Sequence, residues 1–155
     1  MNRGPTRIAA EGLVDASPQV VFAFLADLEN HWLLADRFIE VLTLERPPGG
    51  GPARGGTVRM RGPLGLGRTV RTRVVEAAPA TVIAGTASVG ARTEAHVRWT
   101  LTPSSRGTRV RLEASVERVG RAELVLLAIG GRRWLERRFT SILQTLARRV
   151  AGVGQ

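Results

Sequence analysis

The sequence predicts a single α+β domain with a seven-stranded antiparallel sheet, two short helices near the N-terminus and one long C-terminal helix. Apolar and polar residues alternate over 92–101 and 109–117, which is typical of antiparallel strands with one covered and one solvated face. From Leu135 to Val150, apolar residues recur at steps of three and four, which predicts an amphipathic helix over the sheet. Because there is no internal repeat and no second composition regime, residues 1–155 are expected to form one domain.

The first part of the chain carries strand and helix signals in turn. Residues 7–15 alternate in polarity and form the first predicted strand. Ser17 provides an N-cap and Pro18 a first helical position for a helix that ends near Asp27. Asn30 is expected to cap a second, short helical turn.

Six further strands follow, separated by turns rich in Pro and Gly. Their predicted ranges are 39–45, 57–61, 68–76, 81–87, 92–101 and 109–117. The final helix is expected over 121–150, and the pair Gly130-Gly131 is expected to bend or loosen it.

The composition excludes several kinds of chemistry. The chain has no Cys, which removes disulfides, thiolate metal sites and thiol nucleophiles. All 23 basic residues are Arg, so neither a Schiff-base lysine nor a phosphate-loop lysine is available. The two histidines lie far apart in the sequence and away from any carboxylate cluster, so we expect no metal and no cofactor. No catalytic constellation is predicted.

The net charge is +10, which raises the question of nucleic acid or an anionic membrane as a partner. Arginines line one face of neighbouring predicted strands and the outer face of the last helix. These residues are Arg59, Arg61, Arg71, Arg73, Arg133, Arg137 and Arg148. Only three Trp and four Phe are present, so the aromatic side chains needed for base stacking are missing. A Lys-free, Arg-rich composition is also what a GC-rich genome encodes, and we favour that explanation of the charge.

No targeting or membrane segment is predicted. The N-terminal residues 1–16 have no apolar stretch long enough for a signal peptide. The longest apolar run, 122–129, is far shorter than the roughly 20 residues that a membrane span needs. We therefore expect a cytoplasmic protein. The sequence does not distinguish a monomer from a homodimer.

Three segments and the order of elements resemble one known superfamily. The segments are Val14–Phe22 (VDASPQVVF), Ala26–Trp32 (ADLENHW) and Gly107–Val110 (GTRV). They are similar to the strand-to-helix entry, the helix-to-helix corner and the last-strand opening of the SRPBCC superfamily. This superfamily includes START domains, birch-pollen-type allergens and polyketide cyclase/dehydrase proteins. The resemblance covers essentially the whole chain and implies a helix-grip fold, in which a curved sheet and the long helix enclose a cavity.

The resemblance further implies a hydrophobic small molecule, such as a lipid, polyketide or quinone, bound in that cavity. Strand and helix periodicity then predict which side chains face it. The candidate ligand-binding residues are Trp32, Phe38, Met60, Val70, Thr72, Val74, Thr93, Ala95, Val97, Trp99, Leu112, Ala114, Leu124, Leu127, Ala128 and Leu135. Small residues among them favour empty volume over a filled core. Thr72 and Thr93 are candidates to orient a polar group of the ligand, or are simply good strand residues.

Ligand binding is the leading hypothesis, and polyketide cyclase or dehydratase activity in the same cavity is the alternative. That alternative needs proton transfer by Glu76, His31 or Arg37. Strand parity places His96 on the solvated face, and His31 is expected at the helical corner, either at the cavity rim or on the surface. Basic-surface binding to RNA or an anionic membrane is a third, less favoured hypothesis.

Overall fold

The computed structural model describes residues 6–35, 39–61, 67–90, 92–120 and 131–151. Four of the candidate ligand-binding residues lie outside this part of the chain. These are Phe38, Leu124, Leu127 and Ala128.

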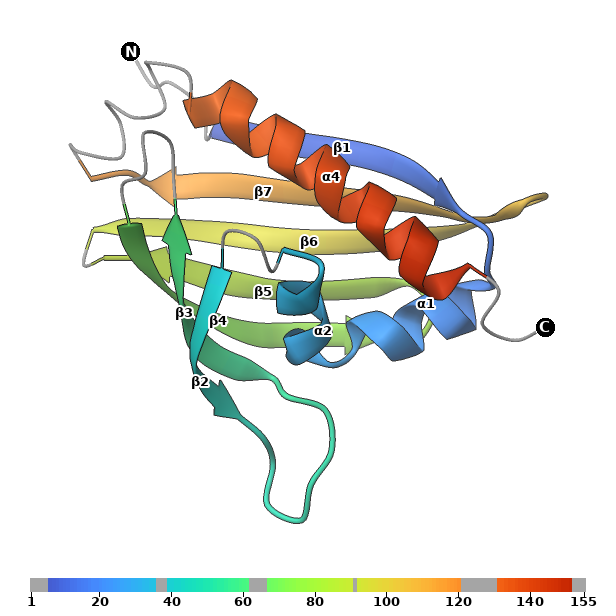
Figure 1. Cartoon of the computed structure of the whole chain (residues 1–155), viewed down its shortest axis with the longest axis horizontal. Helices are drawn as coiled ribbons and strands as arrows, with labels where there is room; N and C mark the ends of the chain where they lie inside the picture. The colour runs from blue at the N-terminus through green and yellow to red at the C-terminus, as the bar shows by residue number, and fades with distance from the viewer. Residues whose placement is uncertain (1–5, 36–38, 62–66, 91, 121–130, 152–155) are drawn as a thin grey trace.

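Seven antiparallel strands form one sheet in the order β1-β7-β6-β5-β4-β3-β2, which confirms the predicted fold class (Figure 1). The strands are β1 Thr6–Val14, β2 Ile39–Glu45, β3 Gly55–Arg61, β4 Gly67–Ala78, β5 Val82–Val89, β6 Thr93–Ser104 and β7 Gly107–Arg118. All neighbouring strands except the β1–β7 pair follow one another in the chain, and β1 joins the sheet beside the last strand. β1 and β2 are therefore the two edges.

The helices are α1 Pro18–Leu25, α2 Leu28–Leu33 and α4 Arg132–Val150. Ser17 caps α1 as predicted, because its hydroxyl accepts a hydrogen bond from the Val20 amide. The predicted cap of the second helix is wrong. Asp27 caps α2 by accepting from the Glu29 amide, while the side-chain amide of Asn30 donates to the carbonyl of Phe24.

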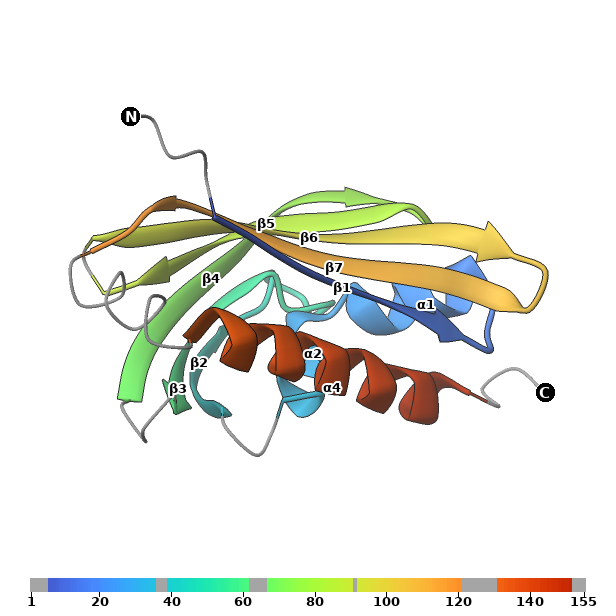
Figure 2. The ribbon, with the colours of Figure 1, turned by 90° about the horizontal axis from the view of Figure 1, so that it is seen from above.

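The sheet is curved, and the helices lie on its concave side (Figure 2). We call this side the inner face. α4 packs chiefly along the edge strand β1, where a Cβ built on Gly12 would lie 3.5 Å from Cβ of Leu143. Arg132, at the start of α4, also donates to the carbonyl of Arg7 in β1. The helix therefore follows one side of the sheet.

The strand register sets the composition of the inner face. One row across the sheet runs through Gly56, Thr72, Ala87 and Ala95. The next row runs through Val74, Gly85, Val97 and Ala114. The centre of the inner face is thus apolar and built mainly from small side chains.

Buried side chains gather in two separate clusters on this face. The first, which we call the α4 cluster, joins α1, α4, β1 and β5–β7 and includes Leu25, Trp99 and Leu146. The second, the α2 cluster, joins α2, β3 and β4 and consists of Leu28, Trp32, Ala53, Val58 and Val70. The core of the described chain is therefore divided in two.

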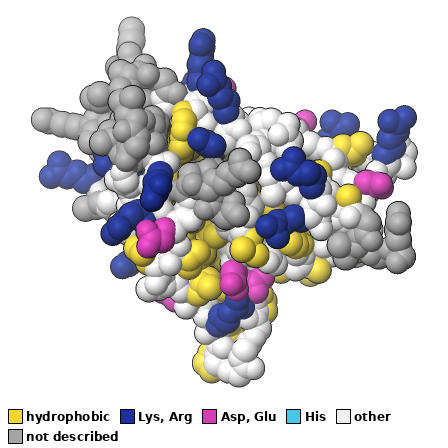
Figure 3. Space-filling model, viewed as in Figure 1, with side chains coloured by type: hydrophobic (Ala, Val, Ile, Leu, Met, Phe, Trp, Pro, Cys, Tyr) yellow, Lys and Arg dark blue, Asp and Glu magenta, His cyan; other side chains and the backbone are white. Residues whose placement is uncertain are grey.

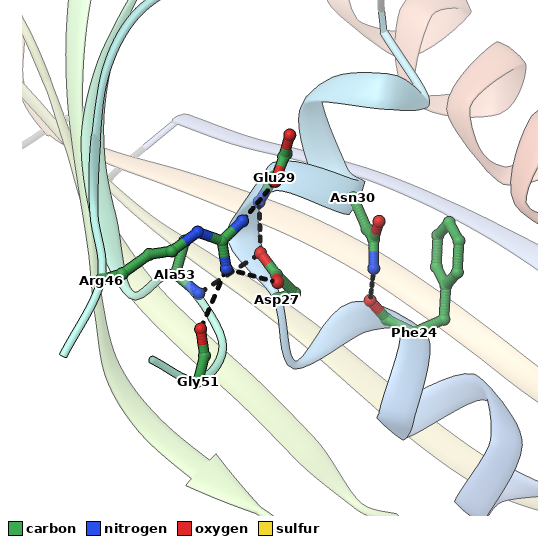
Figure 4. A network of polar contacts seen from close by, with 7 residues as sticks. All are labelled: Phe24, Asp27, Glu29, Asn30, Arg46, Gly51 and Ala53. Atoms are coloured by element: carbon green, nitrogen blue, oxygen red, sulfur yellow. Dashed lines mark hydrogen bonds and ion pairs between the residues drawn. The ribbon is translucent and has the colours of Figure 1, made fainter. Parts of the chain in front are cut away.

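A polar network anchors α2 to the loop between β2 and β3 (Figure 4). One carboxylate oxygen of Asp27 accepts from the amides of Glu29 and Ala53, and the other accepts from Arg46 at 2.9 Å. Arg46 also binds the Glu29 carboxylate and the Gly51 carbonyl, and the Leu28 amide donates to the Ala53 carbonyl. These contacts fix where α2 sits above the sheet.

The network also sets the charge state of Asp27. Burial alone would raise the pKa of Asp27, but hydrogen bonds from Arg46 and from the amides of Glu29 and Ala53 outweigh it and hold the pKa below its ordinary value. A carboxylate with a lowered pKa stabilises the fold above the unfolded-state pKa of about 3.9. That stabilisation is lost as the pH falls through the lower, folded-state pKa.

The helix side of the molecule carries basic side chains scattered around exposed apolar ones (Figure 3). Among the described residues, the large exposed apolar side chains are Leu13, Leu33, Val41, Leu42 and Val75. No helix in this part of the chain is long and apolar enough to cross a membrane.

Substituting two inner-face glycines tests the packing of the helices. Gly56→Ala should lower the free energy of unfolding by about 1–3 kcal/mol, because the new methyl meets the Thr43 carbonyl and lies 2.5 Å from Cη2 of Trp32. Gly12→Ala should change it by less than about 1 kcal/mol, because its methyl finds only ordinary contacts with Leu143. Urea denaturation measures both, and equal losses would contradict this packing.

Replacing the cap of α2 tests the polar network. Asp27→Ala should lower the free energy of unfolding by about 1–2 kcal/mol at pH 7, because the cap and the bond to Arg46 are both lost. The difference from the wild type should begin to shrink below about pH 4, where the unfolded chain takes up a proton at Asp27, and should keep shrinking as the pH falls through the lower pKa of the folded state.

The matched control is Glu117→Ala, which removes an exposed contact with His96 and should cost less than about 0.5 kcal/mol. Chemical denaturation at pH 7 and pH 3 provides the measurement. A loss for Asp27→Ala that is as large at pH 3 as at pH 7 would rule out the electrostatic part of the explanation.

Candidate ligand-binding site

Between the two clusters, the centre of the inner face is only partly buried. The partly exposed residues are Thr72, Val74, Ala87, Ala95 and Val97, and we call this region the inner-face gap. Val74 touches both clusters, whereas Ala95 packs against neither. Apolar side chains at the centre of a concave face thus remain accessible, which is a property of small-molecule sites.

The register places every described candidate on the strands at an inner-face position, as parity predicts. Their burial divides them into two groups. Val70, Thr93, Trp99, Leu112 and Ala114 are buried, as is Trp32 on α2. Met60, Thr72, Val74, Ala95, Val97 and the helical Leu135 are partly exposed. The partly exposed group keeps apolar surface accessible on the inner face, and four of the buried residues, Trp32, Val70, Trp99 and Leu112, belong to the two clusters.

The two threonines of the inner face differ in what their hydroxyl groups can do. Thr93 accepts a hydrogen bond from the Gly120 amide at 2.9 Å, so its oxygen is engaged with the backbone. The hydroxyl of Thr72 makes no hydrogen bond to any other described residue. Of the two, Thr72 is the better candidate for a polar contact with a ligand.

Two consecutive residues of α2 reach the two different clusters. The ring of Trp32 packs over Gly56 in β3. The ring of His31 meets Trp99 in β6 edge to face, with 5.3 Å between the ring centroids and 60° between the planes. α2 therefore bridges the two clusters, and its two rings flank the inner-face gap.

His31 is half-buried, and its ring is held by contacts within the molecule. Its Nε2 lies 2.5 Å from the carbonyl oxygen of Leu25 at the end of α1. Burial lowers the pKa of His31, against the opposing effects of the Leu25 hydrogen bond and the charge of Asp27. Because Trp99 is distant in the sequence and Leu25 belongs to the preceding helix, no periodicity indicates the position of this ring.

A second ionisable group on the inner side also escaped the sequence interpretation. Arg68 pairs with Met60 and shares the inner-facing parity of Val70, at the start of β4. It is partly buried, and its guanidinium donates to the Gly67 carbonyl at 3.1 Å. Its place at the end of the strand keeps it away from the central rows.

Glu76 lies on the outer face, so its suggested role inside the cavity is wrong. A β-bulge between Val74 and Glu76 shifts the register, which pairs Glu76 with Ala84 and brings it 3.6 Å from Arg98. The third suggested proton-transfer group, Arg37, lies outside the described residues.

The outer face of β1, β6 and β7 carries paired charges. His96 is exposed and lies 3.2 Å from Glu117, which confirms its predicted place on this face. Arg111 binds Glu11 at 3.2 Å and Glu113 at 2.8 Å. The ion pairs of Arg111 with Glu11 and Glu113 are exposed and contribute little to the stability of the fold.

The predicted basic rows are also on the surface. On β3 and β4 they comprise Arg59, Arg61, Arg71 and Arg73, all exposed. The polar face of α4 has a shallow depression of about 420 Å³ in which basic and acidic side chains are mixed. Its lining residues are Arg133, Glu136, Arg137, Thr140, Ser141 and Gln144. Within the described ranges, no three His, Asp or Glu side chains lie together as a metal site.

Comparison with known proteins agrees with this architecture. The most similar folds include TTHA0849 from Thermus thermophilus, with a TM-score of 0.71, 19% identity, and coverage of 97% of this chain and 100% of that one. A START superfamily protein from Mycobacterium smegmatis has a TM-score of 0.70 at 17% identity, covering 95% and 97%. Ara h 8.0201 has a TM-score of 0.66 at 14% identity, covering 95% and 98%.

At these identities the likenesses show the fold. A search of curated proteins found no significant match. The family model described as polyketide cyclase / dehydrase and lipid transport matches residues 5–151, nearly the whole chain. The chain therefore belongs to this family of the SRPBCC superfamily.

Proposed function

We propose that this protein binds a hydrophobic small molecule, of a lipid, polyketide or quinone-like kind, in the inner-face gap. The observation that carries the proposal is the division of the core into two clusters with accessible small apolar side chains between them. The family description, which names lipid transport and polyketide chemistry, supports the same class of ligand.

The dimensions of the gap suit a compact ligand. From Gly56 in β3 to Ala95 in β6 the row crosses three inter-strand spacings, or about 14 Å. The two central rows are two residues apart, or about 7 Å along a strand. One fused ring system or a folded acyl chain fits that area, and its burial against Val74, Ala95 and Val97 supplies roughly 25 cal/mol for each Å² of apolar surface.

Cyclase or dehydratase activity in the same place is the second candidate, and His31 is the observation that favours it. A neutral imidazole at the edge of an apolar site can accept a proton from an acidic carbon or hydroxyl. The carboxylate whose charge reaches His31 is Asp27, but Arg46 and the amides of Glu29 and Ala53 already engage it, so it is a poor partner acid. Binding therefore explains more of the site than catalysis does.

Native mass spectrometry of freshly purified protein tests the proposal even though the ligand is unidentified. We expect a population that carries one added small molecule, which is released on denaturation and is soluble in organic solvent. Incubation with a reactive poly-β-ketone chain tests the second candidate, because a cyclase would change the distribution of cyclised products.

Filling the gap should block binding. In Ala95→Leu, three added carbons enter the space between the two clusters, so the affinity for the neutral fluorescent probe 1-aminoanthracene should fall at least tenfold. The melting temperature should stay within a few degrees of the wild type, because Ala95 packs against neither cluster.

The matched control is His96→Leu, one residue further along the same strand but on the outer face. It should bind 1-aminoanthracene like the wild type in a fluorescence titration. If both variants lose the probe equally, or if the wild type does not bind it, the gap is not a ligand site.

A further inference from the structure

The hydrogen bonding of His31 leaves one of its ring nitrogens available for a ligand. A carbonyl oxygen only accepts hydrogen bonds, so the contact between Nε2 and Leu25 requires the proton to be on Nε2. Burial of the ring lowers the pKa of His31, which keeps the imidazole neutral at pH 7. In that tautomer Nδ1 carries a lone pair and is a hydrogen-bond acceptor.

Nothing in the described part of the chain donates to this acceptor. The contact with Leu25 is the hydrogen bond that His31 makes there, and its ring otherwise meets Trp99. One hydrogen bond buried by a ligand contributes about 0.5–1.5 kcal/mol, so a donor placed at Nδ1 would strengthen binding by a comparable amount. A bound molecule with a hydroxyl group supplies that donor.

The position of the ring connects it to the site described above. Trp99 is two residues from Val97 on the same strand and therefore on the same face, one row beyond the inner-face gap. His31 thus stands at the boundary of the gap, on the helix whose next residue, Trp32, borders the other side. A ligand in the gap would contact apolar side chains of the sheet and one hydrogen-bond acceptor, Nδ1 of His31, at the edge of the gap.

We propose that Nδ1 of His31 accepts a hydrogen bond from the hydroxyl group of the bound ligand, so that the site selects hydroxyl-bearing apolar molecules over hydrocarbons of the same shape. This rests on the proposed function, because it assigns a polar contact to the same ligand. His31 is then a specificity-determining residue.

A matched pair of probes isolates the hydroxyl group. 1-Naphthol and 1-fluoronaphthalene have nearly the same shape, but the fluorine cannot donate a hydrogen bond. Both are to be titrated as competitors of 1-aminoanthracene. In the wild type, we expect 1-naphthol to bind about tenfold more tightly, which is the contribution of one buried hydrogen bond.

Two substitutions separate the two nitrogens of the ring. In His31→Gln the side-chain amide still donates to Leu25 but offers no acceptor at the position of Nδ1, so the preference for 1-naphthol should fall below twofold. In His31→Asn the amide oxygen lies near that position while the Leu25 bond is lost, so a severalfold preference should remain in a less stable protein. Thr86→Val, which removes a hydroxyl from the outer face beside His96, should keep the full preference.

The outcomes distinguish this proposal from the one on which it rests. If 1-aminoanthracene and both naphthalenes fail to bind the wild type, both proposals are wrong. If both naphthalenes bind with equal affinity, or if His31→Gln keeps the preference, ligand binding stands and the role of His31 is overturned.

A measurement on the wild type covers the case in which the variants fail to fold. The chain has two histidines, so nitrogen-15 spectra contain two imidazoles, with the exposed His96 as an internal reference. The Nδ1 resonance of His31 should move on addition of 1-naphthol and stay in place with 1-fluoronaphthalene. An Nδ1 resonance unaffected by bound 1-naphthol would overturn the proposal.

Discussion

The width of the sheet is the constraint on which the rest of this structure depends. Seven strands at a spacing of about 4.8 Å span about 29 Å, whereas one helix with its side chains is about 10 Å across. α4 packs along β1, at one edge, and so leaves much of the apolar inner face to other elements. The buried side chains accordingly form two clusters, and the rows between them stay accessible.

α2 determines how that space is bordered. It is six residues long, which is too short to be stable by itself, so its place depends on tertiary contacts. Asp27 and Arg46 fix its N-terminal end to the loop after β2, and Trp32 fixes its other side to Gly56. The same helix carries His31 to Trp99. Changes in the β2–β3 loop would therefore alter the border of the inner-face gap through α2.

The regular elements could be predicted because each has a local signal. Most strands could be predicted from alternation, and 81–87 from a β-branched run after a turn. Alternation also placed His96 outside and Trp99 inside, in agreement with the register. The bulge at Val74–Glu76 could not be predicted, because it adds one residue to β4 without interrupting the run of strand-forming residues. It reverses the side on which Glu76 lies and so removes a supposed catalytic group.

Features that depend on contacts between residues far apart in the sequence could not be predicted either. Asp27 and Asn30 are both good capping residues, and the choice between them is made by Arg46 and Ala53, which lie 19 and 26 residues away. The inward position of His31 depends on the distant Trp99 as well as on the carbonyl of Leu25. The inward roles of Phe38, Leu124, Leu127 and Ala128 stay predictions, since they lie outside the described residues.

Xenon binding tests the divided core most directly, because xenon enters apolar space that is left unfilled by side chains. A crystal pressurised with xenon should show a bound atom between the two clusters, in contact with Ala95 and Val97. Anomalous density confined to the molecular surface, with close-packed side chains in that place, would contradict the account.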